Sequence, residues 1–402
     1  MQILYISSEY PPETGFGGIG TYTKHVAEGM ALRGNTVHVL SRSLNEVNSV
    51  ALVNGVTVHR ISSGNYNLPK GKIFFPFRQF CYRMLPHTLV RLCWARAVAK
   101  AVKELRNEGN RFDIIEYPEC GGEGYYLKKS PGVRIAKLHT PWYMISEIDR
   151  IREAPGDRIL LTFIEKRSVV NAHLVTSPSQ ALADIIRKRW KLPFIKVIHN
   201  PLPSGDYHQT SGGGWIYTGR VEMRKGVHIL LEAYSEICRT HSGPPPLKII
   251  GRAYGVMSDG TDFGEHIRSQ IRETPLKGNV EWIEGLPLED VKKNLLSSSV
   301  AIFPSIWENF PYAALEAMAC GLAVVASDCG GYPEMLQHGK SGLLVTPKNP
   351  VELKAALEKL LGNREMIYEL GKAARVRVNT HFDTRLICEE VQNIYEKAIR
   401  EN

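Results

Sequence analysis

The chain has 402 residues, 43% of them hydrophobic and 23% charged, and its formal net charge at pH 7 is +9. These values are ordinary for a globular protein long enough for two hydrophobic cores, and the positive charge favours anionic partners such as phosphates, acidic sugars, nucleic acid or a membrane surface. The seven scattered cysteines include no Cys-x-x-Cys pair, and no apolar run reaches the ~18 residues of a membrane span, which argues against a disulfide framework, a zinc knuckle and a transmembrane helix.

Short apolar runs alternate with helical stretches in the first half of the chain. The expected strands lie at residues 3–7, 36–40, 56–61, 113–116, 134–138, 174–177 and 195–199. Between the first two, residues 20–33 form an expected helix with Tyr22, Val26 and Met30 on one face. This alternation predicts a parallel sheet covered by helices.

A segment rich in Pro, Gly and Ser, residues 201–214, interrupts the pattern and indicates a linker. The alternation then restarts, with strands expected at residues 215–218, 247–250, 280–283, 300–303, 323–326 and 342–345. We therefore expect an α/β fold of two Rossmann-like doubly wound domains, residues 1–204 and 205–383, facing across a cleft that is the default ligand site. A final helix, residues 384–402, could pack on either half.

A glycine-rich loop follows the first expected strand. Gly15, Gly17 and Gly20 form a Gly-x-Gly-x-x-Gly pattern, which is typical of dinucleotide-binding folds. The pattern starts well after the strand ends, and no acidic residue ends the second strand to hold a ribose, so a dinucleotide site is disfavoured. Two interpretations remain open: a loop that lets an anionic ligand approach the backbone at a helix N-terminus, and a turn without a ligand.

Two basic residues, Arg220 and Lys225, follow the expected strand at residues 215–218. A guanidinium and an ammonium at the carboxyl end of a strand suit a diphosphate, and the alternative is a solvated surface pair. The chain contains no Asp-x-Asp pair of the kind that often holds magnesium against a diphosphate. We therefore expect the two cations to take the place of a metal.

Residues 304–321 are the most informative stretch. Glu308 lies in a loop just after an apolar run, and Glu316 lies in a short helix that Pro311 opens and Gly321 closes. This arrangement brings an acid and a helix N-terminus to the end of a strand. Such a corner suits a polyhydroxylated ligand that carries phosphate.

Several motifs occur in a characteristic order: the glycine loop, His139-Thr140-Pro141, His199-Asn200-Pro201, Gly219-Arg220 with Lys225-Gly226, and Glu308 with Glu316 in a Glu-x7-Glu frame. In this order the chain resembles the retaining glycosyltransferases of family four (glycosyl transferases group 1), which have the two-domain GT-B architecture. The resemblance extends over essentially the whole chain. It is most specific at residues 303–327, followed by Gly330-Gly331 and Glu334.

The resemblance implies four catalytic residues. Arg220 and Lys225 would bind the diphosphate of a nucleotide sugar, Glu308 would hold the donor sugar, and His139 would lie near that sugar. Preorganised cations would act where the leaving group gains negative charge.

The resemblance also implies further donor contacts. Glu316 would accept hydrogen bonds from the ribose hydroxyls, and the final helix would pack on the N-terminal half. The phosphate would meet Gly18 or its neighbours Gly17 and Ile19. The remaining contacts would be made by the backbone of Asn309, Phe310 and Pro311 to the sugar, and by groups near Gly251, Arg252, Trp282, Ile283 and Glu284 to the base.

Structural roles for these residues remain open from the sequence alone. His139 could be a buried structural histidine, and Glu316 could be an acid on a helix surface. Glu308 could cap a helix, which is compatible with sugar binding.

The activity implied is transfer of a hexosyl group, with retention, from a nucleotide-diphosphate sugar such as UDP-glucose to a sugar or glycolipid acceptor in bacterial polysaccharide biosynthesis. The expected partners are the nucleotide sugar and a sugar or lipid-linked sugar acceptor, without metal, other cofactor or nucleic acid. A nucleotide-sugar epimerase on the same fold is the main alternative, but no acid–base set around the second sugar carbon can be assigned. A dehydrogenase and a non-catalytic sugar-binding protein are further alternatives.

The N-terminus lacks the basic region of a signal peptide, and together with the cysteines it predicts a cytoplasmic protein. Residues 70–103 carry eight basic residues among hydrophobic and aromatic ones. This stretch could be a core helix with a cationic edge, an acceptor site, or a peripheral contact with an anionic membrane. A nucleic-acid surface is possible on charge alone, but no nucleic-acid motif accompanies it.

Overall fold

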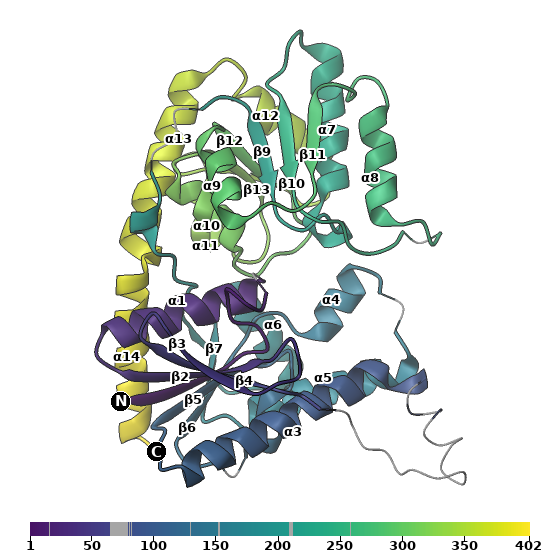
Figure 1. Ribbon diagram of the computed structural model, residues 1–402. Helices are drawn as coiled ribbons and strands as arrows, with labels where there is room; N and C mark the ends of the chain where they lie inside the picture. Colours follow the sequence, from purple (N-terminus) through teal and green to yellow (C-terminus); the bar gives the residue numbers. More distant parts are fainter. Residues whose placement is uncertain are drawn as a thin grey trace. The chain divides into compact units, whose positions relative to one another are not determined.

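The computed structural model describes residues 1–15, 17–64, 79, 81, 83–128, 130–151, 153–208, 212–257 and 259–402 (Figure 1). The chain divides into two compact units. Unit 1 comprises Met1–Ser146, Arg152–Pro201 and Thr384–Asn402, and unit 2 comprises Glu147–Ile151 and Leu202–Asp383. The C-terminal helix therefore belongs to the unit that contains the N-terminus.

Unit 1 is built on an eight-stranded sheet with the order β3-β4-β2-β1-β5-β6-β7-β8. All neighbouring strands pair in parallel except β3 and β4. The strands are β1 Gln2–Ile6, β2 Thr36–Arg42, β3 Ser49–Val53, β4 Val56–Ile61, β5 Ile114–Pro118, β6 Val133–Lys137, β7 Leu174–Ser177 and β8 Lys196–Val197. The near-continuous burial of β1, β5 and β6 is that of parallel strands covered on both faces.

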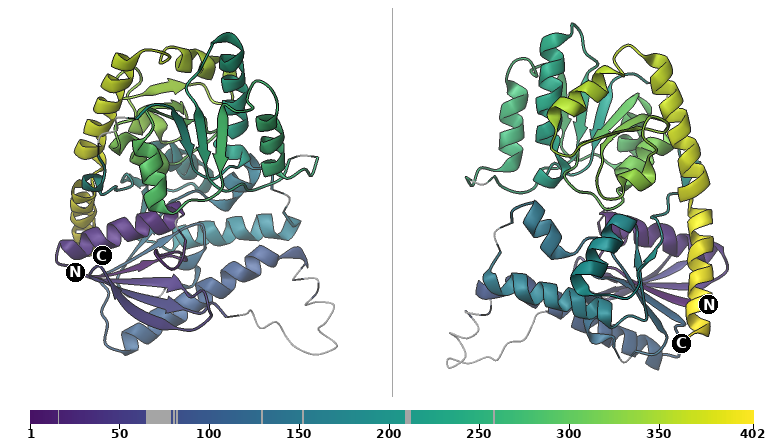
Figure 2. Two further views of the ribbon diagram at one scale, coloured as in Figure 1. Left: turned by 45° about the horizontal axis from the view of Figure 1, so that its top comes forward. Right: turned by 180° about the vertical axis from the view of Figure 1, so that it is seen from behind.

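Helices cover the sheet of unit 1 (Figure 2). They are α1 Gly18–Leu32, α3 Pro86–Asn107, α5 Pro155–Val170, α6 Gln180–Trp190 and α14 Thr384–Arg400. Helix α4 Trp142–Ile148 begins in unit 1, and its last two residues belong to unit 2. As predicted, Tyr22, Val26 and Met30 are buried on one face of α1. Helix α14 packs against α1, and a Cβ on Gly29 of α1 would lie within 2.4 Å of Cys388 Sγ, so the two helices approach closely.

The antiparallel strand β3 was absent from the sequence prediction. Asn54 and Gly55 form its turn to β4, with φ angles of 47° and 80°. These left-handed conformations are typical of the two-residue Asn-Gly hairpin, so the turn was a signal that could have revealed the strand. Val50 and Leu52 are 66% and 76% exposed, so β3 lacks the buried face of its neighbours.

Unit 2 contains a six-stranded parallel sheet with the order β11-β10-β9-β12-β13-β14. Its strands are β9 Trp215–Thr218, β10 Leu247–Ile250, β11 Val280–Ile283, β12 Val300–Phe303, β13 Ala323–Ser327 and β14 Leu343–Val345. This is the strand order of a doubly wound sheet, and the order reverses between β9 and β12. The predicted strands and fold class are confirmed in both halves.

Seven helices of unit 2 surround this sheet. They are α7 Val227–Thr240, α8 Phe263–Arg272, α9 Leu288–Leu296, α10 Tyr312–Ala319, α11 Tyr332–Met335, α12 Pro350–Glu358 and α13 Arg364–Arg377. Within the described ranges, no helix combines the length and apolar character needed to cross a membrane.

The start of the predicted linker is packed rather than loose. Leu202 is fully buried, and its N–H donates to the Phe382 carbonyl oxygen at 2.8 Å. Ser204 Oγ donates to Asp383 Oδ2 at 2.5 Å. These bonds tie residues 202–204 to residues 382–383 within unit 2. Residues 209–211 of the predicted linker lie outside the described residues.

Candidate active site

The predicted basic and acidic residues follow the two strands at which the order of the unit 2 sheet reverses. Arg220 comes two residues after β9, and Lys225 ends a 3-10 turn at Met223–Lys225. Glu308 lies in the loop after β12, the strand that pairs with β9. Ligands of open parallel sheets bind beyond the carboxyl ends of the strands at such a reversal.

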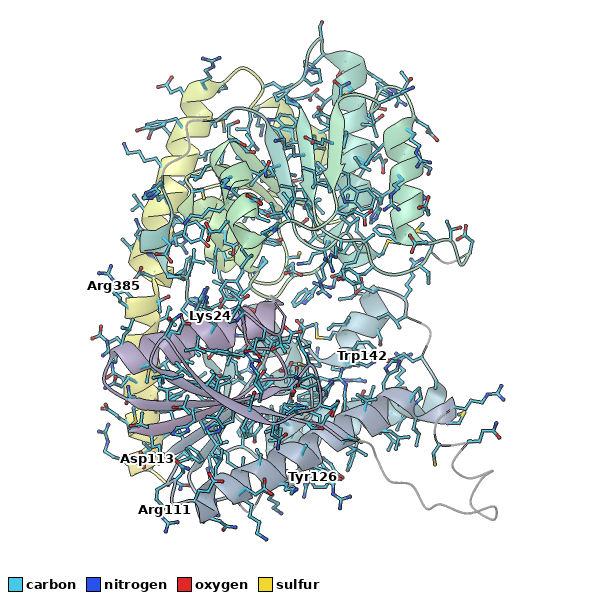
Figure 3. The ribbon with its side chains drawn as sticks, viewed as in Figure 1. Lys24, Arg111, Asp113, Tyr126, Trp142 and Arg385 are labelled. Atoms are coloured by element: carbon cyan, nitrogen blue, oxygen red, sulfur yellow. The ribbon has the colours of Figure 1, made fainter. Side chains whose placement is uncertain are left out.

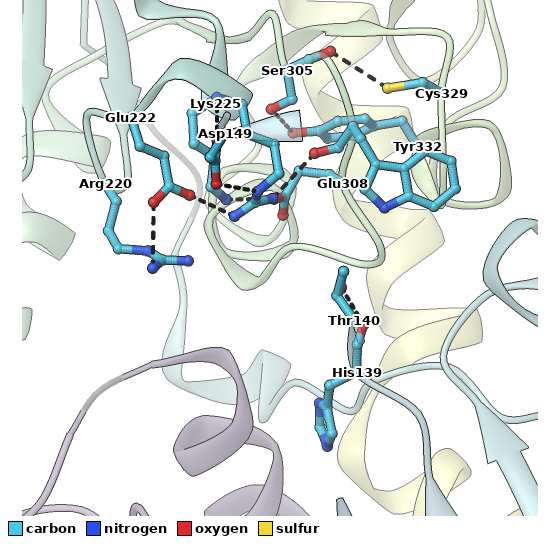
Figure 4. Close-up of polar contacts among 12 residues, drawn as sticks. His139, Thr140, Asp149, Arg220, Glu222, Lys225, Ser305, Glu308, Cys329 and Tyr332 are labelled. Carbon is cyan, nitrogen blue, oxygen red and sulfur yellow. Dashed lines mark hydrogen bonds and ion pairs between the residues drawn. The ribbon is translucent and has the colours of Figure 1, made fainter. Parts of the chain in front are cut away.

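The structure brings Lys225 and Glu308 into direct contact (Figure 4). Lys225 Nζ lies 2.8 Å from Glu308 Oε1, and the same oxygen is paired with Arg224 Nη1. The side chains of Lys225 and Glu308 are only 16% and 9% exposed. The result is a carboxylate clamped by two cations at the end of the sheet.

Arg224 is the residue that sequence analysis missed. It is 5% exposed, its Nη2 lies 2.5 Å from Glu222 Oε1, and its Nη1 donates to the Trp307 carbonyl oxygen at 3.1 Å. Its backbone N–H donates to Asp149 Oδ1 at 2.9 Å. Arg224 therefore ties the turn after β9 to the loop after β12. The sequence signal was the run of alternating charges around it, in which Glu222 also lies.

The cluster is balanced in charge. Arg220, Arg224 and Lys225 face the carboxylates of Glu222 and Glu308, with Asp149 beside Arg224. Burial alone would raise the pKa of Glu308, but Lys225 and Arg224 outweigh it and lower that pKa to about 2. Burial lowers the pKa of Lys225 from its usual value, although Glu308 opposes that effect.

Arg220 differs from the other two cations. Its side chain is 57% exposed and lies 3.3 Å from Glu222 Oε2 (Figure 4). An exposed pair of this kind contributes little to stability and can exchange its partner at low cost. Arg220 is thus the cation of the cluster that is most accessible to a ligand.

Glu316 stands apart from this ion network. It lies in α10, is partly buried, and burial raises its pKa to about 7. Burial, and next to it the charge of Glu316, raise the pKa values of two neighbouring groups. These are Tyr207 and Cys320, and the pKa of Cys320 is raised to about 12. A half-buried carboxyl can accept hydrogen bonds from hydroxyl groups.

Two glycines fix the loop that carries Glu308. Gly330 has φ 56°, and a Cβ there would lie 1.7 Å from the Glu308 carbonyl oxygen. The Gly331 N–H donates to that same oxygen at 3.0 Å. Phe310 is buried against Phe382, with ring centroids 5.3 Å apart, so its backbone rather than its ring is the part suited to a ligand.

The residues predicted near a base lie at the ends of β10 and β11. The Gly251 N–H donates to the Ile283 carbonyl oxygen at 3.0 Å, and Trp282 Nε1 donates to the Gly251 carbonyl oxygen at 2.9 Å. A Cβ on Gly251 would lie 1.8 Å from the Gly219 carbonyl oxygen, which explains why glycine stands there. Arg252 is exposed. Base binding here stays a prediction.

His139 belongs to unit 1 and follows β6. Its backbone N–H donates to Glu119 Oε2 at 2.8 Å, and its ring makes a T-shaped contact with the Tyr22 ring, with centroids 5.4 Å apart. Burial, with a smaller effect of Lys137, lowers the pKa of His139 to about 3. The imidazole is therefore neutral at pH 7 and can donate or accept a hydrogen bond.

The glycine loop of unit 1 encloses the side chain of Glu9. A Cβ on Gly17 would lie 2.5 Å from Glu9 Oε2, and one on Gly20 would lie 3.0 Å from Glu9 Cβ. Space next to Gly18 is open, and Ile19 is partly buried. The glycines thus have a packing role around Glu9, and the phosphate contact stays a prediction. Phe16 lies outside the described residues.

Two family descriptions match successive parts of the sequence. "Glycosyl transferases group 1" matches residues 215–377, and "Glycosyltransferase Family 4" matches residues 16–204. The chain belongs to these glycosyltransferases.

Relatives of this glycosyltransferase match it along its length. Glycogen synthase of Mycobacterium tuberculosis is 25% identical, over 100% of this chain and 95% of its own. Among solved structures, sucrose-phosphate synthase of Thermosynechococcus elongatus has a TM-score of 0.77 at 20% identity, covering 100% of both chains. Anabaena HepE in complex with UDP-glucose has a TM-score of 0.71 at 18% identity, covering 99% of this chain and 100% of its own. These structures establish the GT-B fold.

The basic stretch predicted at residues 70–103 is only partly described in this glycosyltransferase. Residues 70–78, 80 and 82 lie outside the described residues. From Pro86 the stretch is helix α3, with Leu89, Trp94 and Val98 buried and Arg96 and Lys100 exposed. This part is a core helix with a cationic outer edge. The membrane contact stays untested.

Proposed function

We propose that the protein transfers a hexosyl group from a nucleotide-diphosphate sugar, with retention of the anomeric configuration, to a sugar or lipid-linked sugar acceptor. The observation that carries this proposal is the cluster of Arg220, Lys225 and Glu308 at the strand-order reversal of unit 2, with Glu316 on the next helix. It supplies cations for a diphosphate and carboxyls for hydroxyl groups.

In this proposal the cations stabilise the leaving diphosphate. As the bond from the anomeric carbon to the phosphate oxygen breaks, negative charge grows on the phosphate, and charges already in position stabilise the transition state most. Lys225 is held in position by Glu308, and Arg220 is accessible to the ligand. Asn309, Phe310 and Pro311 would hold the sugar through backbone groups.

Glu308 would hold the sugar and Lys225 rather than transfer a proton. With a pKa of about 2 it is ionised at neutral pH. It can accept hydrogen bonds from sugar hydroxyls but has no proton to donate. We assign no general base, and the retaining stereochemistry follows from the family resemblance.

UDP-glucose is the donor that we propose first. Support comes from the solved complex of HepE with UDP-glucose, which shares the fold. The acceptor setting of polysaccharide biosynthesis is supported by the named glycogen synthase relative.

We also propose that the reaction needs no metal. In this proposal Arg220 and Lys225 supply the positive charge that a metal would otherwise bring to the diphosphate. In the ranges that the structure describes, no group of three His, Cys, Asp or Glu side chains is placed to hold a metal ion.

Incubation with UDP-glucose, followed by NMR of all products, tests the proposal. We expect free UDP together with transferred or hydrolysed glucose, and an unchanged rate in EDTA. A new UDP-sugar without free UDP would instead identify an epimerase. Loss of activity in EDTA that magnesium restores would contradict the metal-free mechanism.

A further inference from the structure

Unit 1 contains a cavity of about 340 Å³, whose lining includes Ile19, a residue predicted near the donor phosphate. It lies at the carboxyl ends of β1, β2 and β5, where Ser8, Arg42 and Pro118 line it, and α3 forms another wall. Trp142, at the start of α4, also lines it (Figure 3). Its volume is in the range of small-molecule sites.

Arg42 places a guanidinium group on the cavity wall, near enough to Glu123 to lower the pKa of that carboxyl. Its guanidinium lies over the Trp94 ring at 5.2 Å, and its Nε is buried without a hydrogen-bond partner. In the part of the chain that the structure describes, no carboxylate lies within ion-pair distance of it. A guanidinium cannot lose its charge by deprotonation, so the buried Nε would gain from an anion that accepts its hydrogen bond.

Arg91 adds a second cation to the same lining. It lies over the Trp142 ring at 5.4 Å, and its Nη1 is 3.7 Å from Glu165 Oε1, a long contact for an ion pair. Two guanidinium groups on one small cavity match the oxygens of a phosphate.

Glu123 adds a hydrogen-bond acceptor to the lining of the cavity. Its side chain is 1% exposed, and its Oε1 accepts from Trp94 Nε1 at 2.9 Å. Its Oε2 is buried without a partner. Buried polar atoms are almost always hydrogen-bonded, so this oxygen lacks a donor that a hydroxyl group of a ligand would supply.

Three buried carboxyl groups also lie around the cavity, and Arg91 acts on two of them, Glu123 and Glu165. Glu119, Glu123 and Glu165 are buried, and burial raises the pKa of each, that of Glu119 to about 8. His87 lines the cavity beside Trp142.

We propose that this cavity binds a phosphorylated sugar, with the phosphate on Arg42 and Arg91 and a sugar hydroxyl on Glu123. That this ligand is the acceptor of the reaction rests on the proposed glycosyl transfer. That the cavity binds such a ligand rests on the cavity alone. An uncharged sugar or a lipid tail would offer no anion to the two guanidinium groups on the cavity wall. The phosphate could belong to a free sugar phosphate or to a lipid-linked sugar.

Calorimetric titration of the full-length protein tests the site. The probes are glucose 6-phosphate, glucose, and N-acetylglucosamine linked to farnesyl diphosphate in detergent. We expect a phosphorylated probe to bind and glucose to bind at least about tenfold more weakly. Binding of the soluble probe indicates a free sugar phosphate, and binding of the farnesyl probe alone indicates a lipid-linked acceptor.

Arg42→Gln should weaken binding of the phosphorylated probe at least about tenfold. Arg42→Lys, which keeps the charge but loses the two-pronged guanidinium group, should weaken binding less. Arg96→Gln is the matched control, because Arg96 is an exposed arginine on the same helix as Arg91. UDP binding should be equal in all variants. The proposal is wrong if no phosphorylated probe binds, if glucose binds equally well, or if Arg42→Gln binds like the wild type. Failure of UDP to bind the wild type would instead count against the proposed transferase function.

Discussion

Lys225 is a mostly buried amino group 2.8 Å from Glu308, whose charge opposes the lowering of the Lys225 pKa by burial. Substitution by methionine would retain the volume and remove the charge, while Arg224 would still pair with Glu308. We expect Lys225→Met to reduce turnover with UDP-glucose by about 10²–10³. It should also lower thermal stability, because Glu308 loses the cation that contributes most to stabilising its charge. Lys293→Met, at a 76% exposed lysine, should behave like the wild type. Wild-type turnover in Lys225→Met would remove Lys225 from the site.

Glu316 has a pKa of about 7, against an ordinary value of 4.5. Between these two values the folded state binds more protons than the unfolded state, so stability falls as the pH rises and the full cost is present above pH 7. Glutamine does not titrate. We therefore expect Glu316→Gln to stabilise the fold by on the order of 2 kcal/mol above pH 7, allowing for partial exposure, and by almost nothing below pH 4.5.

Urea unfolding of Glu316→Gln and the wild type, once above pH 7 and once below pH 4.5, measures the difference in their free energies of unfolding. Glu281→Gln, at an exposed strand residue, is the control and should show no pH-dependent gain. Glu316→Gln should also bind UDP-glucose more weakly, because the proposed partner of the ribose hydroxyls is lost. A gain in stability with a loss of function is common where a site keeps a buried polar group. Equal stabilisation at both pH values would contradict the role of burial.

The loop after β12 depends on the turn before α11. Because Gly330 has φ 56° and no room for a Cβ beside the Glu308 carbonyl, we expect Gly330→Ala to cost about 2–4 kcal/mol and to lower activity by displacing Glu308. Gly339→Ala is a matched control, since Gly339 has φ 74° but open space around it. Chemical denaturation should show the control losing only about 1 kcal/mol. Equal losses would show that contact with Glu308 is unimportant.

The short strands and the helix around Glu316 could be predicted because their signals are local. Apolar runs bounded by Gly and Pro mark β9, β12 and β13, and Pro311 and Gly321 mark the ends of α10. The contacts of Arg224 could not be predicted, because they join segments that are far apart in sequence. These segments are the turn after β9, the loop after β12 and Asp149. Sequence alone also does not show which partner an ionised side chain takes.

The two ends of the chain meet inside unit 1. Tyr395 Oη in α14 donates to Glu116 Oε2 at 2.7 Å and lies 3.3 Å from Tyr5 Oη in β1. Tyr22 Oη donates to the other Glu116 oxygen at 2.9 Å. The predicted return of the last helix to the N-terminal half thus has a specific polar contact, which a sequence pattern cannot reveal.

Removing one donor from Glu116 should be costly. We expect Tyr395→Phe to destabilise the protein by about 1–3 kcal/mol, because a buried carboxyl oxygen loses its partner. Tyr368→Phe, at a 54% exposed tyrosine of unit 2, should change stability very little. Thermal unfolding of both variants measures the difference. Identical unfolding temperatures would show that the contact does not hold α14 in place.

The assignment of a nucleotide-sugar site to unit 2 is tested most directly by a crystal structure with bound UDP-glucose. We predict that the diphosphate contacts Arg220 and Lys225, the ribose hydroxyls contact Glu316, and the glucose lies against Glu308. A donor bound elsewhere, with Arg220 and Glu316 facing bulk solvent, would contradict the assignment.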